Sequence, residues 1–310
     1  MPSSGRFLLF RRRLARAACV ALILGLPLSA CSGVLEPHGP VDLSERLILF
    51  DSLAIMLAIV VPVILATLAV AWWFRASNTR AAYWPDWAFS GRLELIVWAI
   101  PALVITFLGG IAWFGSHALD PFSPLEGEGN AKPLEVEVVS LDWRWLFIYP
   151  DDGVATINQL VVPVGSPIHF KLTSNGVMNG FFVPELGSQI YTMAGMTSQL
   201  YLQADNAGTY PGISTNFSGD GFSGMHFGVR ALPAEGYAQW VADAKASADR
   251  LDATSYADLA KQSEDASPKT FGAIDEKLFG AIVDGTAPPA EGPEALPGGQ
   301  DAPRSRSGGS

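Results

Sequence analysis

The sequence has only two cysteines among its 310 residues, Cys19 and Cys31, and both lie near the N-terminus. A disulfide framework or a thiolate metal site needs several cysteines, so the sequence excludes both from everything that follows Cys31. Charged residues are also scarce, at 16% against 49% hydrophobic residues. This balance is too apolar for an ordinary soluble protein and too polar for a protein made only of membrane helices. We therefore expect one part of the chain to lie in a membrane and another part to be soluble.

Acidic residues are absent from the first thirty positions, which contain five arginines, whereas the whole chain has a net charge of −10. The remainder is therefore more acidic than the whole. Binding to nucleic acid depends on neutralising phosphates, so we expect no nucleic-acid partner. The acidic excess fits a solvated face of a soluble domain, and an acidic surface that docks a partner is the alternative.

The N-terminal segment has the parts of a bacterial lipoprotein signal peptide. Arg6 to Arg16 form a positive region, and Ala17 to Leu26 form an apolar stretch too short to span a bilayer. Leu28-Ser29-Ala30-Cys31 resembles a lipobox, in which the cysteine thiol receives diacylglycerol before the signal is cut. We expect residues 1–30 to be removed and Cys31 to be lipidated. The alternative is a plain signal peptide or anchor with an incidental cysteine.

Two apolar runs, at about residues 53–74 and 93–114, are long enough to cross a bilayer. Tryptophans stand near their ends, where aromatic belts of membrane proteins lie. We expect residues 31–120 to form a lipid anchor and a transmembrane hairpin in a bacterial inner (plasma) membrane.

The loop between the two runs predicts their direction. It contains Arg75, Arg80 and Arg92 against only Asp86, and positive loops face the cytoplasm. The N-terminus and everything after His117 would then be periplasmic. The lipobox requires the same side, so two independent features predict one topology.

Glu94 lies one turn inside the second apolar run. An ionisable group at membrane depth is costly and is a functional candidate by default. The alternative is that Glu94 reaches the cytoplasmic interface or pairs with Arg92.

From Glu135 onward the pattern changes to short alternating segments, which are typical of strands. The expected strands follow one another about every ten residues, with Gly, Pro and Asn between them. This pattern predicts an all-β Greek-key sandwich over residues 130–233. The expected strands are Glu135–Val139, Trp143–Tyr149, Gln159–Val164, Ile168–Thr173, Gly180–Val183, Gln199–Gln203 and His226–Ala231, with a turn at Asp151-Asp152-Gly153.

Beyond Pro233 the chain is rich in alanine and charge, which predicts a short helical region over residues 234–284. Residues 285–310 consist mainly of Pro, Gly, Ala and Ser with scattered charge. Such a composition cannot bury a core, so we expect a disordered tail.

Four segments of the chain, Leu93–Trp98 with Pro101, Leu141–Trp145, Val177–Pro184 and Gly212–Met225, together resemble in their order the motifs of subunit II of the haem–copper respiratory oxidases. Leu93–Trp98 with Pro101 resembles that family's second-span motif, and Leu141–Trp145 resembles its aromatic segment. Val177–Pro184 and Gly212–Met225 resemble the loops that carry its copper ligands. The resemblance runs from Cys31 to about Gly280. It implies that the sandwich is cupredoxin-like, and that the fold is a transmembrane hairpin, this sandwich and a short C-terminal helical segment.

The copper-ligand positions separate the branches of this family. Members that oxidise cytochrome c hold a dinuclear copper centre with two Cys, two His and a Met, because soft thiolates bridge the metals. Here the five corresponding residues are Asn179, Ser214, Ser218, Phe222 and Met225, of which only Met225 keeps its ligand type. The run Phe217–Met225 resembles the ubiquinol-oxidising branch, the cytochrome bo type.

The resemblance therefore implies a subunit of a proton-pumping ubiquinol:oxygen oxidoreductase that binds no metal or other cofactor and has no catalytic residue of its own. Haem b, haem o and one copper are expected in the partner subunit I, with ubiquinol as electron donor and no role for cytochrome c. The expected partners are subunit I, the other small membrane subunits and membrane lipid. Glu94 matches the family carboxylate at the cytoplasmic mouth of a proton channel. Trp143 and Trp145 are interpreted as packing residues.

Two other classes of function are alternatives to this interpretation. A cytochrome c oxidase subunit would need the copper ligands. A stand-alone copper chaperone or assembly factor would need an exposed Met/His or Cys cluster, which six Met and four His do not form in this sequence. A metal site at His226 and His169 is disfavoured, because ordinary surface or core histidines explain both.

Overall fold

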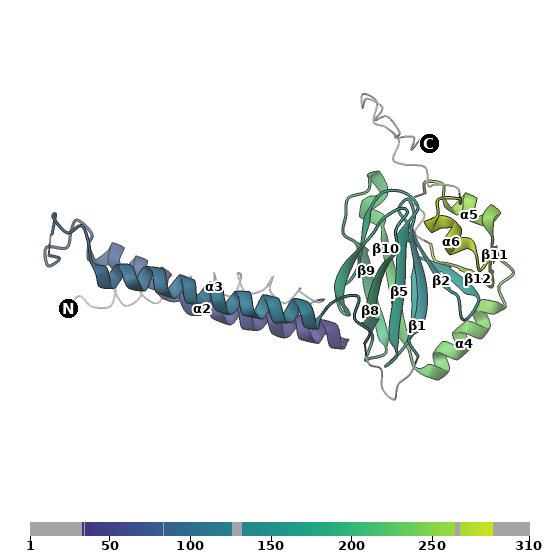
Figure 1. Ribbon diagram of the computed structural model, residues 1–310, viewed down its shortest axis with the longest axis horizontal. Coiled ribbons are helices and arrows are strands. Elements are labelled where there is room, and N and C mark those ends of the chain that lie inside the picture. The colour runs from purple at the N-terminus through teal and green to yellow at the C-terminus, as the bar shows by residue number, and fades with distance from the viewer. Residues whose placement is uncertain (1–32, 34, 83, 126–131, 264–266, 288–310) are drawn as a thin grey trace, which may run out of the picture.

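The computed structural model describes residue 33 and residues 35–82, 84–125, 132–263 and 267–287. The expected signal peptide, the lipidation position Cys31 and the expected tail beyond residue 287 lie outside the described residues. The expected fold class is confirmed: a long two-helix hairpin precedes a β-sandwich, and a C-terminal region with short helices covers one side of the sandwich (Figure 1).

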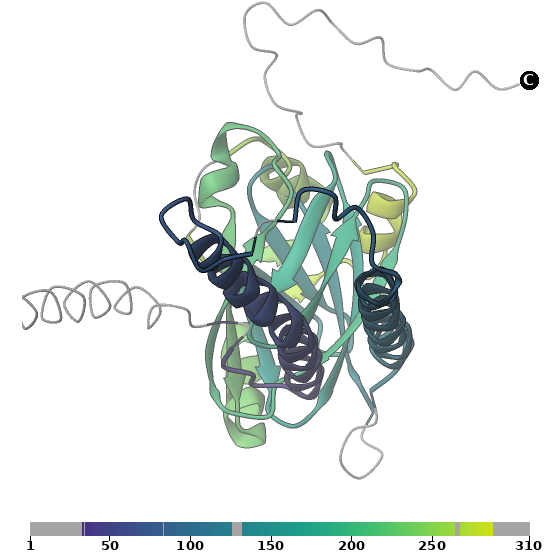
Figure 2. The same cartoon turned by 90° about the vertical axis from the view of Figure 1, so that its left-hand side faces the viewer.

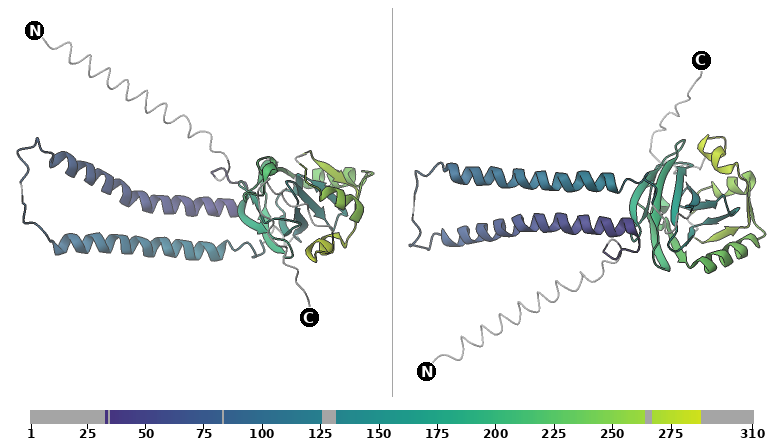
Figure 3. Two further views of the ribbon diagram at one scale, coloured as in Figure 1. Left: turned by 90° about the horizontal axis from the view of Figure 1, so that it is seen from above. Right: turned by 60° about the horizontal axis from the view of Figure 1, so that its bottom comes forward.

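The hairpin consists of α2 (Pro40–Trp73) and α3 (Gly91–Ala118), which run antiparallel (Figure 3). Both helices are long and apolar enough to cross a membrane. They touch closely near the sandwich, where a side chain on Gly115 would come within 2.8 Å of Ile48. Glycine at this position therefore lets the two backbones approach each other.

The first helix begins well before the expected span at about residue 53, because Pro40 supplies a favourable first helical position after Gly39. At 34 residues, α2 is about 51 Å long, which exceeds the hydrocarbon thickness of about 30 Å. Its first turns lie against the sandwich, with Val41 buried and Glu45 accepting hydrogen bonds from the backbone N–H and hydroxyl of Ser188 at 3.1 and 2.9 Å. Only the remainder of α2 is available to cross a membrane.

The sandwich consists of two mixed sheets. In each sheet one neighbouring pair is parallel, β1 with β5 and β10 with β4, and the other pairs are antiparallel, which reflects a Greek-key path. The six-stranded sheet has the order β12 (Lys269–Phe271), β3 (Val154–Ile157), β2 (Trp145–Tyr149), β1 (Leu134–Ser140), β5 (Pro167–Ser174) and β8 (Ser198–Gln203). The five-stranded sheet has the order β4 (Gln159–Pro163), β10 (His226–Leu232), β9 (Gly208–Ser214), β6 (Asn179–Val183) and β7 (Gly187–Thr192).

Each strand expected from the sequence is present, but β3, β7 and β9 were not predicted. The sequence of β9 contains two glycines and a proline, which weaken a strand pattern. Trp143 was also expected in a strand, yet it lies in the turn before β2 with a φ of 64°. Its left-handed backbone marks a turn rather than a strand.

Aromatic side chains fill the space between the two sheets. Trp145 packs edge-on against Phe181 at 5.4 Å between ring centroids, and Phe181 stacks on Phe227 at 5.1 Å. Each such side chain stabilises the fold by about 1.5–3 kcal/mol through burial, and each ring pair adds about 0.5–1.5 kcal/mol. Trp145 has no exposed surface, which agrees with its interpretation as a packing residue.

Apart from its first helix, α4 (Ala234–Lys245), the C-terminal region covers the outer face of the six-stranded sheet, on the side away from the five-stranded sheet (Figure 1). The helix α4 packs instead at one edge of the sandwich, against strands of both sheets. The C-terminal region was expected to be helical, and it does contain helices, but it also contains short strands, one of which joins the sheet. The outer faces of β2 and β3 are apolar and need a cover, which this region supplies. Besides β12 and α4, its elements are β11 (Arg250–Leu251), α5 (Ala253–Leu259), β13 (Ala273–Ile274) and α6 (Leu278–Val283).

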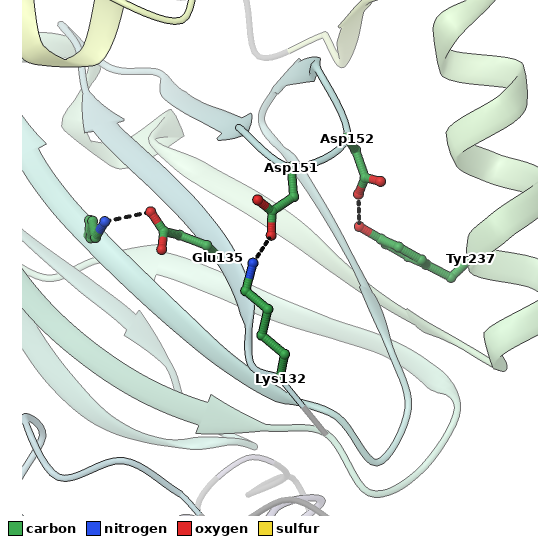
Figure 4. Close-up of polar contacts among 6 residues, drawn as sticks. Lys132, Glu135, Asp151, Asp152 and Tyr237 are labelled. Atoms are coloured by element: carbon green, nitrogen blue, oxygen red, sulfur yellow. Dashed lines mark hydrogen bonds and ion pairs between the residues drawn. The ribbon is translucent and has the colours of Figure 1, made fainter. Parts of the chain in front are cut away.

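Polar side chains gather at one end of the six-stranded sheet, around the predicted turn at residues 151–153 between β2 and β3, where Gly153 has a φ of 71°. Lys132 contacts Asp151 at 2.7 Å, and the Tyr237 hydroxyl on α4 donates to Asp152 at 2.7 Å (Figure 4). On the neighbouring strands Glu135 pairs with Lys171 (Figure 4). These contacts fix α4 and the N-terminal end of β1 to the turn.

Glu137 lies on β1 opposite Lys171 of β5. Burial raises its pKa to about 7, the nearby Lys171 lowers it and Glu135 raises it. The folded state therefore binds a proton on the Glu137 carboxyl more tightly than the unfolded state does. As a result, the free energy of unfolding falls as the pH rises from about 4.5 to about 7, and above that pH Glu137 contributes no further change.

Replacing Glu137 by Gln is expected to remove this pH dependence, because the amide stays neutral. The thermal midpoint of the full chain in detergent should rise by about 2–4 °C at pH 8 and stay unchanged near pH 4.5, for an effect of about 1 kcal/mol after solvent screening. The exposed Glu276→Gln variant is the control. Equal midpoints for Glu137→Gln and the unaltered chain at pH 8 would contradict the assignment.

Candidate functional site

The two loops that resemble copper-binding loops meet at one end of the sandwich. Asn179 begins β6 and Ser214 ends β9, and these strands are neighbours in the five-stranded sheet. The backbone N–H of Ser214 donates to the Met225 carbonyl at 3.2 Å, which closes the base of the longer loop. The structure therefore brings Asn179, Ser214 and Met225 together, and all three are buried.

A buried chain of hydrogen bonds joins the two sheets at this end. The Ser214 hydroxyl donates to the Asn179 side-chain oxygen at 2.6 Å, and the Asn179 amide donates to the Ser140 hydroxyl at 2.8 Å. The Thr192 hydroxyl donates to the Asn179 carbonyl at 3.3 Å. Asn179 is 1% exposed and Ser214 is 7% exposed. Buried polar groups are tolerated only when they are paired, and here each one has a partner.

The remaining two positions lie on the loop between β9 and β10. The carbonyl of Ser218 accepts a hydrogen bond from the Trp143 indole N–H at 3.2 Å. The Phe222 ring lies 5.7 Å from that of Phe217, which is 75% exposed. Ser218 therefore contributes a backbone hydrogen bond to this loop, and Phe222 contributes a ring contact within it.

Trp143 also restricts the shape of this loop. A side chain on Gly221 would come within 2.3 Å of the Trp143 ring, so only glycine fits there. Trp143 is buried against the loop and donates its N–H to it, which agrees with its interpretation as a packing residue.

Sequence reasoning missed Ser140 and Thr192, the two hydroxyls that complete the chain around Asn179. Each is a buried polar residue at the last position of a strand, Ser140 in β1 and Thr192 in β7. A polar residue at an inward position is the signal that could have found them.

The other sequence candidates lie elsewhere. Glu94 is in the first turn of α3, remote from the sandwich, and within the described residues it makes no ion pair with Arg92. His169 stacks on Tyr201 at 4.4 Å and contacts Gln199 at 3.1 Å, while His226 is exposed at the start of β10. The described residues contain no group of three His, Cys, Asp or Glu that could hold a metal ion.

Two family models match the C-terminal half of the chain. "Cytochrome C oxidase subunit II, periplasmic domain" matches residues 152–232, and "COX Aromatic Rich Motif" matches residues 245–289. The second match covers most of the C-terminal region that packs on the six-stranded sheet.

Relatives match over most of the chain. It is 46% identical over 265 residues to the cytochrome bo(3) ubiquinol oxidase subunit 2 of Pseudomonas aeruginosa, covering 85% of this chain and 80% of the relative. It is 47% identical over 272 residues to the ubiquinol oxidase subunit 2 of Acetobacter aceti, covering 87% and 88%. The chain belongs to the ubiquinol oxidase subunit 2 family. The resemblance inferred from the sequence motifs is thereby confirmed.

Among solved structures, the periplasmic domain of subunit II of the Bradyrhizobium japonicum cytochrome oxidase matches 40% of this chain and 97% of its own length. The identity is 22% and the TM-score is 0.37.

In this ubiquinol oxidase subunit, replacing Asn179 by Ala is expected to leave the Ser214 and Ser140 hydroxyls buried without their partner. The loss of about 2 kcal/mol of local stability should speed backbone hydrogen exchange in residues 214–225 about thirtyfold. Hydrogen exchange with mass spectrometry on the full chain measures this.

The matched control is Asn216→Ala, which removes a solvent-exposed hydrogen bond from the amide to the Met178 carbonyl. It should change the exchange rates little. Equal effects of the two variants would show that the buried chain does not hold the loop.

Proposed function

We propose that this chain is the subunit II of a proton-pumping ubiquinol:oxygen oxidoreductase, without catalytic residues and without a dinuclear copper centre. The observation that supports the proposal is the buried hydrogen-bond chain through Ser214, Asn179 and Ser140. It occupies the positions where cytochrome c-oxidising relatives need metal ligands. The terminal-oxidase role agrees with the relatives, which are named ubiquinol oxidase subunits.

The side chains at those positions do not fit a dinuclear copper centre. Bridging two copper ions needs soft thiolates, whereas positions 214 and 218 provide serine hydroxyls. Asn179 uses its side-chain oxygen and amide for hydrogen bonds, and Phe222 provides no ligand atom. Met225 alone could ligate, and one thioether cannot hold two metals.

Electrons then reach the complex without passing through this chain. A ubiquinol dissolved in the membrane would donate to the partner subunit I, which would hold haem b, haem o and one copper. Subunit II and the other small membrane subunits would support that subunit, and cytochrome c would have no role. No residue of this chain takes part in electron transfer in this proposal.

The proposed location is a bacterial inner membrane, with the interhelical loop in the cytoplasm and the sandwich in the periplasm. The excess of arginine in that loop supports this direction. The lipobox sequence supports a lipid on Cys31, which would place the mature N-terminus on the periplasmic side.

Glu94 is proposed as a proton-uptake residue at the cytoplasmic end of α3. It is exposed in the isolated chain and has no ion pair within the described residues. A carboxylate in the first turn of a spanning helix lies near the cytoplasmic water and can pass protons toward a partner subunit.

The test of this function is oxygen consumption by the complex purified through a tag on this chain. Turnover is expected with ubiquinol and not with reduced cytochrome c. Intact-mass measurement on the same preparation should show a chain that begins at Cys31 and bears a lipid. Turnover with cytochrome c, or purification without a haem-bearing partner, would overturn the assignment.

Replacing Glu94 by Gln is expected to lower ubiquinol-driven turnover about tenfold, because the amide cannot relay protons. Glu94→Asp should restore part of the activity. Asp86→Asn, which removes the acid of the adjacent loop, is the control and should leave turnover unchanged. Oxygen consumption and its pH profile measure the effect, and unchanged turnover in Glu94→Gln would refute the proton-uptake role.

A further inference from the structure

The loop end of the hairpin, far from the sandwich, contains a large hollow that the proposed function does not use. Figure 2 looks along the hairpin from this end. The hollow has a volume of about 860 Å³ and lies between the ends of α2 and α3 and the loop that joins them. Its lining includes Trp73, Phe74, Trp84, Trp87, Leu93 and a single charged residue, Arg80.

The aromatic lining is strongly exposed in this chain. Trp84 is 73% exposed and Trp87 is 57% exposed, although burying such side chains is strongly favourable. Tryptophans gather at the boundary between hydrocarbon and water, where the ring meets acyl chains and the N–H meets polar headgroups. The lining of the hollow therefore suits a molecule with an apolar body at the membrane surface.

The charge of the hollow comes from Arg80. Arg75, its neighbour in the loop, is already engaged: its guanidinium donates to the Trp72 carbonyl at 2.7 Å and lies 4.7 Å above the Trp72 ring. For Arg80 the described residues give only a backbone contact, from its N–H to Asn78 at 3.1 Å. Its exposed guanidinium is thus available to a ligand of the hollow.

These features point to one kind of ligand. A guanidinium binds a phosphate strongly, with paired hydrogen bonds, and the surrounding loop has a positive excess, with Arg75 and Arg80 against Asp86. A quinol has a neutral head and leaves this charge without a counterpart. An anionic phospholipid matches both the aromatic lining and the charge.

We propose that this hollow binds an anionic phospholipid of the cytoplasmic leaflet. Its phosphate lies at Arg80, and its acyl chains lie along Trp73, Trp84 and Trp87. The binding depends on the proposed membrane orientation but not on the electron donor or on the Glu94 role. It gives the loop a membrane contact at the end opposite the periplasmic sandwich.

The test measures phosphatidylglycerol binding to the purified whole complex by native mass spectrometry, with Arg80→Gln as the variant. Loss of one cation near the membrane surface should weaken binding about fivefold. Arg92→Gln is the matched control, because it removes the same charge from the first turn of α3, next to the loop, at a residue that does not line the hollow. Its affinity for phosphatidylglycerol should remain within twofold of the unaltered complex.

Equal binding of phosphatidylglycerol by the Arg80→Gln and unaltered complexes would overturn the proposal, as would equal binding of phosphatidylcholine and phosphatidylglycerol. A photoreactive residue at position 84 that crosslinks to another subunit or to ubiquinone, and not to lipid, would also overturn it. Ubiquinol-driven oxygen consumption on the same preparations separates the two proposals. In the unaltered complex, absence of lipid binding with normal oxygen consumption would overturn only the lipid proposal, and normal lipid binding without ubiquinol-driven oxygen consumption would overturn only the proposed function.

Discussion

The buried hydrogen bonds through Asn179 determine the shape of the loop end of the sandwich. Ser140 belongs to β1 of the six-stranded sheet, whereas Asn179 and Ser214 belong to β6 and β9 of the five-stranded sheet. One amide side chain therefore joins both sheets at this end of the sandwich. Because an unpaired polar group in this position would cost about 1–3 kcal/mol, the three residues depend on one another.

The junction between the hairpin and the sandwich depends on a second set of polar contacts. The Glu45 carboxylate accepts two hydrogen bonds from Ser188 of β7, and the backbone N–H of Tyr201 on β8 donates to the Pro121 carbonyl just after α3. Both helices are thus held at strands that form neighbouring edges of the two sheets. This arrangement keeps the sandwich at one end of the hairpin, as Figure 3 shows, while the arginine-rich loop and its aromatic hollow lie at the other.

The turn between β1 and β2 connects the C-terminal covering region to the loop between β9 and β10. The Arg144 guanidinium donates to the carbonyl of Leu259 at the end of α5 and to that of Lys261 just beyond it, at 2.9 Å each. Arg144 directly follows Trp143, which packs on the loop that contains Ser218. A single turn between β1 and β2 therefore contacts both the loop between β9 and β10 and the covering region.

The sequence by itself determined the membrane hairpin, most of the strands and the absence of cysteine after Cys31, because apolar length, alternation and residue identity are local properties. It also pointed to Asn179, Ser214 and Met225 through their motifs. It could not show that Asn179 hydrogen-bonds Ser140, because strands far apart in the chain meet only when the sheets pack. For the same reason, only the tertiary structure decided that α2 begins at Pro40 against the sandwich. Likewise, only folding brought Arg80 and the tryptophans around one hollow, since Trp73 comes from the end of α2 whereas Arg80, Trp84 and Trp87 come from the loop that follows it.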